Sequence, residues 1–168
     1  MTGDGKNVIF SIMGDFRKAN TGGRRNEKPL TDEQKKEVKD YALSLGMPED
    51  KVRFIDHGLT GYGAAFDVMK VGTDVAPLNE RVKDPNSNIS LKGTIAHEIV
   101  GHRDASLNGF TQKDDLLEEV QASIRAARFA PGLCRLERFD LIRDAVSRLR
   151  NGRKFLRDEK RKLYINER

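Results

Sequence analysis

The residues best suited to chemistry lie in the segment 93–106, which reads GTIAHEIVGHRDAS. It contains His97, Glu98 and His102, whereas the usual zinc-peptidase motif, H-E-x-x-H, would place its second histidine one position earlier. In that motif the two histidines bind zinc and the glutamate acts as a general base. The offset of one residue raises the question of whether both histidines can reach the same ion.

Helix geometry gives the condition under which they can. Residues in an α-helix advance by about 100°, so two side chains five positions apart diverge by about 140°. A π-helical turn inserts one residue and returns both histidines to the same side, and such turns are frequent at functional sites. Gly101 is the residue best able to adopt the distorted backbone. The sequence therefore predicts a π-type turn here, and the alternative is an amphipathic helix with two structural histidines.

A catalytic zinc ion takes a third protein ligand and keeps one position open for water. The best candidates are Glu118 and Glu119 on the next predicted helix. At 100° per residue, Glu119 lies at the margin of the apolar face of that helix and Glu118 points nearly opposite to it. Glu119 is thus the predicted third ligand, and the alternative is a solvated acidic pair near a helix start. That apolar face consists of Leu116, Val120, Ile124 and Ala127.

The two segments HEIVGH and EEVQAS together resemble the paired motifs of the dipeptidyl peptidase III family of zinc peptidases. Members of that family use H-E-x-x-G-H and a second helix that begins with two glutamates. The resemblance covers these two short motifs only, and the loop between them is much shorter here. It implies that His97, His102 and Glu119 are zinc ligands. It also implies that Glu98 is the general base and that Glu118 is a partner that orients a histidine.

One residue departs from that family's pattern. Ser123 stands where the family has an acidic residue. The substrate site of a dipeptidyl peptidase is therefore not carried over to this chain.

A second resemblance spans more of the chain, from Gly93 to Arg150, and includes EEVQASIRAARFAPGL and ERFDLIRDAVSRLR. This region is similar to the C-terminal domains of polymorphic bacterial toxins, such as those attached to Rhs-repeat and wall-associated proteins, among which zincin-like metallopeptidase domains are found. The resemblance implies an effector domain that is secreted or delivered by a larger bacterial protein, acts in a target cell and is neutralised by a cognate immunity protein. The abrupt start, MTGDGK, fits a domain cut from something longer.

The elements that must position these residues predict an α+β fold, and the toxin resemblance implies that it is of the zincin-like kind. We expect one catalytic domain over residues 1–168, with 1–28 partly mobile, in which a small and mostly antiparallel sheet packs on the metal-binding helix and on further C-terminal helices. Segments 51–57 and 64–77 are predicted as a hairpin or two antiparallel neighbours, separated by a glycine turn. The remaining predicted elements are strands at 7–13 and 161–168, and helices at 30–46, 88–109, 111–130 and 135–152.

Two helices carry specific expectations. Thr31 and Gln34 have the spacing of a capping box at the start of the helix at 30–46, and Gly46 ends it. The last helix is expected to turn one apolar face to the core. That face consists of Phe139, Ile142, Val146 and Leu149.

Composition narrows the class of protein. Cys134 is the only cysteine, so an internal disulfide and a cysteine-based zinc site are both excluded. No apolar run reaches the ~18 residues that a membrane span requires, and the N-terminus lacks the features of a secretory signal. We therefore expect no membrane span.

Basic residues are concentrated in the tail. Residues 135–168 hold 12 Lys and Arg against 6 Asp and Glu, whereas the rest of the chain is close to neutral. A solvated helix face explains this better than a nucleic-acid partner does, since aromatic residues for base stacking are sparse. A basic nucleic-acid-binding module with incidental histidines stays as one alternative function.

The leading expectation is a zinc metallopeptidase that cleaves a protein or peptide substrate, with Glu98 as the general base for a zinc-activated water. A zinc hydrolase of a non-peptide bond is the other alternative, because such a site activates water without naming the substrate. The strand at 65–71 is the expected edge on which an extended substrate lies. Candidates for stabilising an oxyanion, each with a structural role as its alternative, are Tyr164, His57 and Tyr62.

Overall fold

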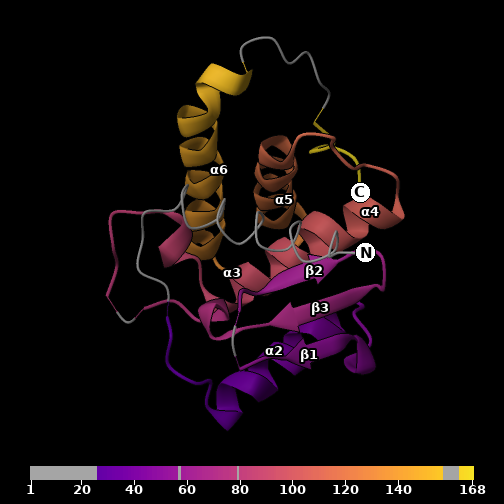
Figure 1. Ribbon diagram of the computed structural model, residues 1–168, viewed down its shortest axis with the longest axis vertical. Coiled ribbons are helices and arrows are strands. Elements are labelled where there is room, and N and C mark those ends of the chain that lie inside the picture. Colours follow the sequence, from indigo (N-terminus) through magenta and orange to yellow (C-terminus); the bar gives the residue numbers. More distant parts are fainter. Residues whose placement is uncertain (1–25, 57, 79, 157–162) are drawn as a thin grey trace, which may run out of the picture.

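The computed structural model describes residues 26–56, 58–78, 80–156 and 163–168 (Figure 1). The strand predicted at 7–13 and most of the segment predicted to be mobile, 1–28, lie outside the described residues. The helices and strands are α2 (Asp32–Ser44), β1 (Val52–Phe54), β2 (Gly61–Gly63), β3 (Val68–Val71), α3 (Leu91–Ala96), a π-helical segment η4 (His97–Arg103), α4 (Asp104–Leu107), α5 (Asp115–Phe129) and α6 (Arg135–Leu156), with short 3-10 turns η1 (Glu49–Lys51), η2 (Thr73–Val75) and η3 (Asn86–Asn88).

The architecture is a mixed α+β arrangement, as predicted. Segments α3, η4 and α4 form one continuous helical rod, which lies between the small sheet on one side and α5 with α6 on the other (Figure 1). Helix α2 packs against α3. The rod that carries the histidines is therefore enclosed from several directions, and α5 faces it directly.

In the part of the chain that the structure describes, the sheet has three strands in the order β1-β3-β2. Strand β1 is parallel to β3, with Val52 opposite Met69, and β2 is antiparallel to β3, with Tyr62 opposite Met69. The prediction that the segments containing β1 and β3 are antiparallel neighbours is therefore wrong. The glycine segment predicted as a turn is itself a strand, and the tight turn comes after it, where Asp67 adopts a left-handed conformation at φ 48°.

Local signals correctly located the first helix. The side chain of Thr31 accepts from the Gln34 backbone N–H while the Gln34 side chain accepts from the Thr31 backbone N–H, which is a complete capping box. At the other end Gly46 has φ 82°, a conformation that favours glycine. No strand is present within 163–168, so that part of the prediction for 161–168 is wrong.

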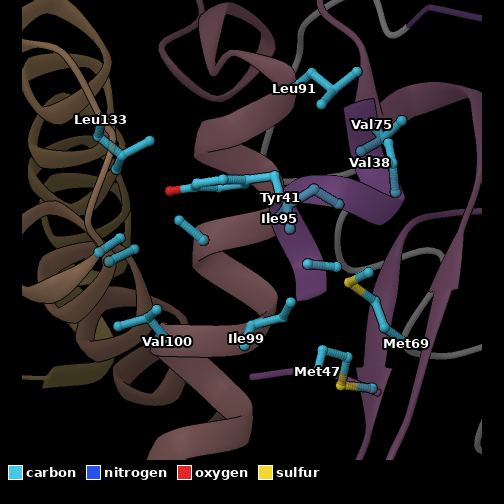
Figure 2. Packing of buried hydrophobic residues seen from close by; sticks show 14 of the residues in the cluster. Val38, Tyr41, Met47, Met69, Val75, Leu91, Ile95, Ile99, Val100 and Leu133 are labelled. Atoms are coloured by element: carbon cyan, nitrogen blue, oxygen red, sulfur yellow. The ribbon is translucent and has the colours of Figure 1, made fainter. Parts of the chain in front are cut away.

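The hydrophobic core lies between the rod, the sheet and α2 (Figure 2). Ile95 and Ile99 of the rod are fully buried, and Met69 of β3 and Met47, which follows α2, are fully buried beside them. Apolar burial of this kind is the main source of folding free energy. It holds the rod against the sheet and so fixes the direction in which the next turn of the rod points.

Helix α6 turns a different face to the core from the one predicted. Phe139, Ile142 and Val146 are exposed, whereas Leu141 and Ala145 are buried. Two carboxylates, Asp140 and Asp144, are buried on this inner face, a position that requires compensating partners. None of the helices in the described part of the chain has the length and apolar composition needed to cross a membrane.

The hydroxyl of Tyr41 joins α2 to the turn between α5 and α6 by donating to the Pro131 carbonyl at 2.7 Å. We predict that Tyr41→Phe lowers the free energy of unfolding by about 1 kcal/mol, the usual net value of one such bond. Urea denaturation at neutral pH measures this loss. Tyr62→Phe is a matched control for removal of a tyrosine hydroxyl, because the Tyr62 hydroxyl bonds to Asp67, which is nearby in the sequence.

The ionisation of Tyr41 also makes the free energy of unfolding depend on pH. Burial, followed by the charge of Glu137, raises the Tyr41 pKa to about 12 from its ordinary value of 10.0. Because the folded state holds this proton more tightly, the contribution is complete below about pH 10 and is lost as pH rises towards 12. The stability advantage of wild type over Tyr41→Phe should therefore stay constant up to about pH 10 and shrink from about pH 10 towards about pH 12. An advantage that stays constant between about pH 10 and about pH 12 would contradict the assignment.

Candidate metal centre

The metal centre begins with the π-helical segment η4, which covers His97–Arg103. The backbone N–H of Asp104 donates to the carbonyl of Ile99, five residues earlier, as π-helical pairing requires. The predicted π-type turn is therefore present at the predicted place. It brings the Nε2 atoms of His97 and His102 to 3.1 Å from each other.

Helix α5 brings the third candidate ligand. Glu119 Oε2 lies 3.3 Å from His97 Nε2, and Glu119 Oε1 lies 3.5 Å from His102 Nε2. One donor atom from each of these three residues lies within 4.8 Å of the others. The structure thus gathers the three residues that the sequence singled out as ligands.

The donor set fits a zinc ion in both chemistry and spacing. Imidazole nitrogen and carboxylate oxygen are zinc ligands, and atoms bound tetrahedrally at ~2.0–2.1 Å lie roughly 3.3–3.4 Å from one another. The two histidine nitrogens are 3.1 Å apart, and the Glu119 carboxylate comes close to this spacing with a different oxygen for each histidine, Oε2 at 3.3 Å from His97 and Oε1 at 3.5 Å from His102. The side chains of His97, His102 and Glu119 are 8%, 13% and 17% exposed, so the cluster is largely buried and His97 lies deepest in it.

Charge also favours a cation at this position. The carboxylates of Glu98, Glu118, Glu119 and Asp144 gather around the two histidines, and Arg148 is the guanidinium bound to this group. A divalent ion offsets part of the negative excess, which is costly at partly buried positions.

His102 responds to these carboxylates. Burial opposes its charged form, but hydrogen bonds with Glu118 and Glu119 and the charges of Glu119 and Glu98 outweigh burial and raise its pKa to about 10. Without a metal, His102 therefore carries a proton at neutral pH. A metal ion at this position takes the place of that proton.

Glu118 also reaches the site. Its Oε1 lies 3.4 Å from His102 Nδ1, and its Oε2 accepts from the Gln112 backbone N–H at 2.7 Å. The helical wheel, which pointed Glu118 nearly opposite to the apolar face of α5, therefore did not indicate this contact: Glu118 and its neighbour Glu119 both reach His102. This contact matches the orienting role that the motif resemblance implied for Glu118.

Glu98, the predicted general base, is 3% exposed and lies at the sheet edge. Its Oε2 accepts from the backbone N–H of Tyr62, in β2, at 2.8 Å. Among the described residues no donor contacts Oε1, which leaves that oxygen for proton transfer. The bond from β2 fixes the carboxylate while the adjacent residue, His97, faces the other ligands.

The three oxyanion candidates have different positions. His57 lies outside the described residues. The hydroxyl of Tyr62 contacts Asp67 Oδ1 at 3.1 Å, and burial, then the Asp67 hydrogen bond, raises the Tyr62 pKa to about 12. Tyr164 stacks on Phe110 with ring centroids 4.7 Å apart, on the side of α5 that carries the buried guanidinium of Arg125. Their proposed role stays a prediction.

Three residues at the centre were not predicted. Ser123 Oγ lies 3.1 Å from His97 Nδ1 and donates to Asp144 Oδ2 at 2.7 Å. Arg148 contacts Asp144 Oδ2 through Nε at 2.8 Å and Glu119 Oε2 through Nη1 at 3.2 Å. The available signals were the serine inside EEVQAS and an acidic and a basic residue four positions apart on the last helix.

Gly101 lies inside the π-helical segment, where it was predicted, and it also matters for the packing of that segment on α5. A Cβ at this position would lie 2.7 Å from both the Cβ and the carbonyl oxygen of Ala122, in α5. The absence of a side chain therefore lets η4 and α5 approach closely enough for their ligands to meet. Gly101 is not among the glycines with a left-handed backbone.

Comparison of the chain with protein-family models, with curated proteins and with solved structures gives no match. A functional proposal has to rest on the geometry of the site.

Proposed function

We propose that this protein is a zinc-dependent hydrolase, and specifically a metallopeptidase. The observation that carries the proposal is that the Nε2 atoms of His97 and His102, 3.1 Å apart, both face the Glu119 carboxylate, whose Oε2 and Oε1 lie 3.3 Å and 3.5 Å from them respectively. Bound zinc would supply a Lewis acid that polarises a carbonyl and lowers the pKa of a water molecule towards neutrality.

Glu98 is placed to act as the base. Because Tyr62 N–H holds Oε2, the other oxygen, Oε1, accepts a proton from water and delivers it to the leaving amine. The buried position excludes bulk water from this carboxylate and keeps its orientation constant.

The sheet edge favours a peptide as the substrate. Strand β3, at 68–71, is flanked on both sides, so the prediction that it is an edge strand is wrong. Within the described residues the edge strand beside the histidines is β2, whose Tyr62 N–H points away from β3 and towards Glu98. Because the Tyr62 N–H is committed to Glu98, an extended peptide beside this edge would use other backbone groups of β2, and its scissile bond would lie near the metal position.

The toxin resemblance extends this proposal to the biological setting. Under it, the domain is delivered into a target cell by a larger bacterial protein, and a cognate immunity protein covers the site. This setting is supported by the resemblance over Gly93 to Arg150 alone.

The direct test is the zinc content of the purified protein beside His102→Ala and Glu119→Ala. We expect about one zinc per wild-type chain and a loss of affinity in both variants that exceeds the ~10–100-fold typical of a residue that only supports a ligand. Glu118→Gln is the matched control, because it alters a neighbouring carboxylate and is expected to stay within that range.

Peptide cleavage is tested next, by mass spectrometry of a peptide library incubated with the zinc-loaded protein. Zinc-dependent cleavage that a chelator abolishes supports the peptidase. Zinc binding without cleavage of any peptide would redirect the proposal to another hydrolysable bond. A wild-type protein that binds no zinc would overturn the proposal as a whole.

A further inference from the structure

A buried chain of hydrogen bonds links His97 to a carboxylate on a different helix. Nδ1 of His97 lies 3.1 Å from Oγ of Ser123, in α5, which is fully buried. That hydroxyl lies 2.7 Å from Oδ2 of Asp144, in α6, which is 2% exposed. The other ring nitrogen of His97, Nε2, faces His102 and Glu119.

The direction of each hydrogen bond follows from the partners of Asp144. Oδ2 of Asp144 also accepts from Nε of Arg148 at 2.8 Å, and Oδ1 accepts from the Asn86 amide at 3.2 Å. Since a guanidinium N–H can only donate, Oδ2 is an acceptor, and the hydrogen between it and Ser123 belongs to the serine. Ser123 has one hydroxyl hydrogen, so its oxygen must accept from His97, and Nδ1 carries the proton.

We propose that Asp144 and Ser123 form a relay that fixes His97 as its Nδ1–H tautomer, with the lone pair of Nε2 directed at the metal position. Asp144 is a positioning residue that acts through Ser123. Metal-bound histidines commonly donate their other ring N–H to a fixed acceptor, and that contact increases their strength as ligands.

The same carboxylate also reaches the third ligand. Arg148, held by Asp144, contacts Glu119 Oε2 through Nη1 at 3.2 Å. Asp144 is therefore connected to two of the three candidate ligands, through one intermediate residue in each case. Helix α6, which supplies no ligand itself, sets how both are presented.

The tautomer can be measured without any metal, so this test is separate from the test of the proposed function. Long-range ¹H–¹⁵N NMR of the metal-free wild-type protein distinguishes a protonated from an unprotonated ring nitrogen. We expect His97 Nδ1 to be protonated and Nε2 to be unprotonated. A predominant Nε2–H tautomer would overturn the relay even in a protein that binds zinc.

Variants test whether the relay supports the metal, a step that rests on the proposed zinc site. Ser123→Ala removes one oxygen and is expected to give a mixture of tautomers and a zinc dissociation constant about 10–100-fold higher. Asp144→Ala should change the His97 tautomer and raise the zinc dissociation constant in the same direction as Ser123→Ala does. The reason is that the Ser123 hydroxyl, without Asp144, is free to donate to His97. Thermal melting of each variant verifies that it is folded.

Two controls complete the design. Ser123→Thr keeps the hydroxyl and should restore the wild-type tautomer and tighter zinc binding than Ser123→Ala shows. Ser147→Ala removes a serine hydroxyl elsewhere on α6 and should change neither readout. If Ser123→Ala keeps the wild-type tautomer and zinc affinity, the relay is overturned. If the wild-type protein binds no zinc, the proposed function fails while the NMR result still decides the tautomer.

Discussion

Under the proposed function, we expect that replacing Glu98 by glutamine leaves zinc bound and reduces peptide hydrolysis by roughly 10²–10⁴-fold, the usual contribution of a positioned general base. The glutamine amide oxygen can still accept from the Tyr62 N–H, which lies 2.8 Å from the carboxylate in the wild type. An amide nitrogen in place of Oε1 has no basicity at neutral pH. The variant therefore separates proton transfer from metal binding.

The measurement is the rate of cleavage of the peptide that the library screen identifies, with zinc content determined on the same samples. Glu49→Gln is a suitable control, because Glu49 pairs with Lys39 on an exposed surface. It should keep the wild-type rate. A Glu98→Gln protein that cleaves at the wild-type rate would remove this residue from the chemistry.

Gly101→Ala is expected to damage the fold and the metal site together. The new methyl group would lie 2.7 Å from the Cβ and the carbonyl oxygen of Ala122 and 2.8 Å from its Cα, so η4 and α5 must move apart. Overpacking of this kind typically costs about 1–3 kcal/mol. Because His97 and His102 lie on η4 and Glu119 on α5, the same separation weakens zinc binding.

Urea denaturation and zinc titration measure the two effects. Gly63→Ala is the matched control, since a Cβ there has an ordinary contact of 3.6 Å with the Val68 carbonyl oxygen. Adding Ala122→Gly to Gly101→Ala should rescue only part of the loss, because the backbone atoms of residue 122 stay in the way. Unchanged stability and zinc affinity in Gly101→Ala would show that the close approach of the two helices is not required.

Helix α6 shows why the apolar pattern of a helix does not by itself identify the face that is buried. Phe139, Ile142 and Val146 are its most apolar stripe, yet they are exposed, and the face with Asp140 and Asp144 is buried. Burying a carboxylate is unfavourable unless donors meet it, and most of the donors here lie outside the helix: Arg81 and Asn86 are 59 and 58 positions away from Asp140 and Asp144, and Ser123 belongs to α5. Only the pairing of Asp144 with Arg148, four residues on, leaves a mark within the helix itself.

The ligands themselves were predictable because their arrangement is set by local rules. The five-residue spacing of His97 and His102 required a π-type turn, and the helical period placed Glu119 beside the apolar face of its own helix. The caps at Thr31 and Gly46 were readable for the same reason, since each depends on residues within one or two turns.

Tertiary structure alone decided the sheet pairing, the edge strand and the relay to His97. The strand order β1-β3-β2 depends on which distant backbone groups meet, and three short strands carry too little alternation to specify it. Ser123 and Asp144 acquire their role only when α5 and α6 pack together. The sequence by itself thus determined which side chains could bind a metal, because helix geometry is local, whereas long-range packing determined what holds them and which strand lies beside them.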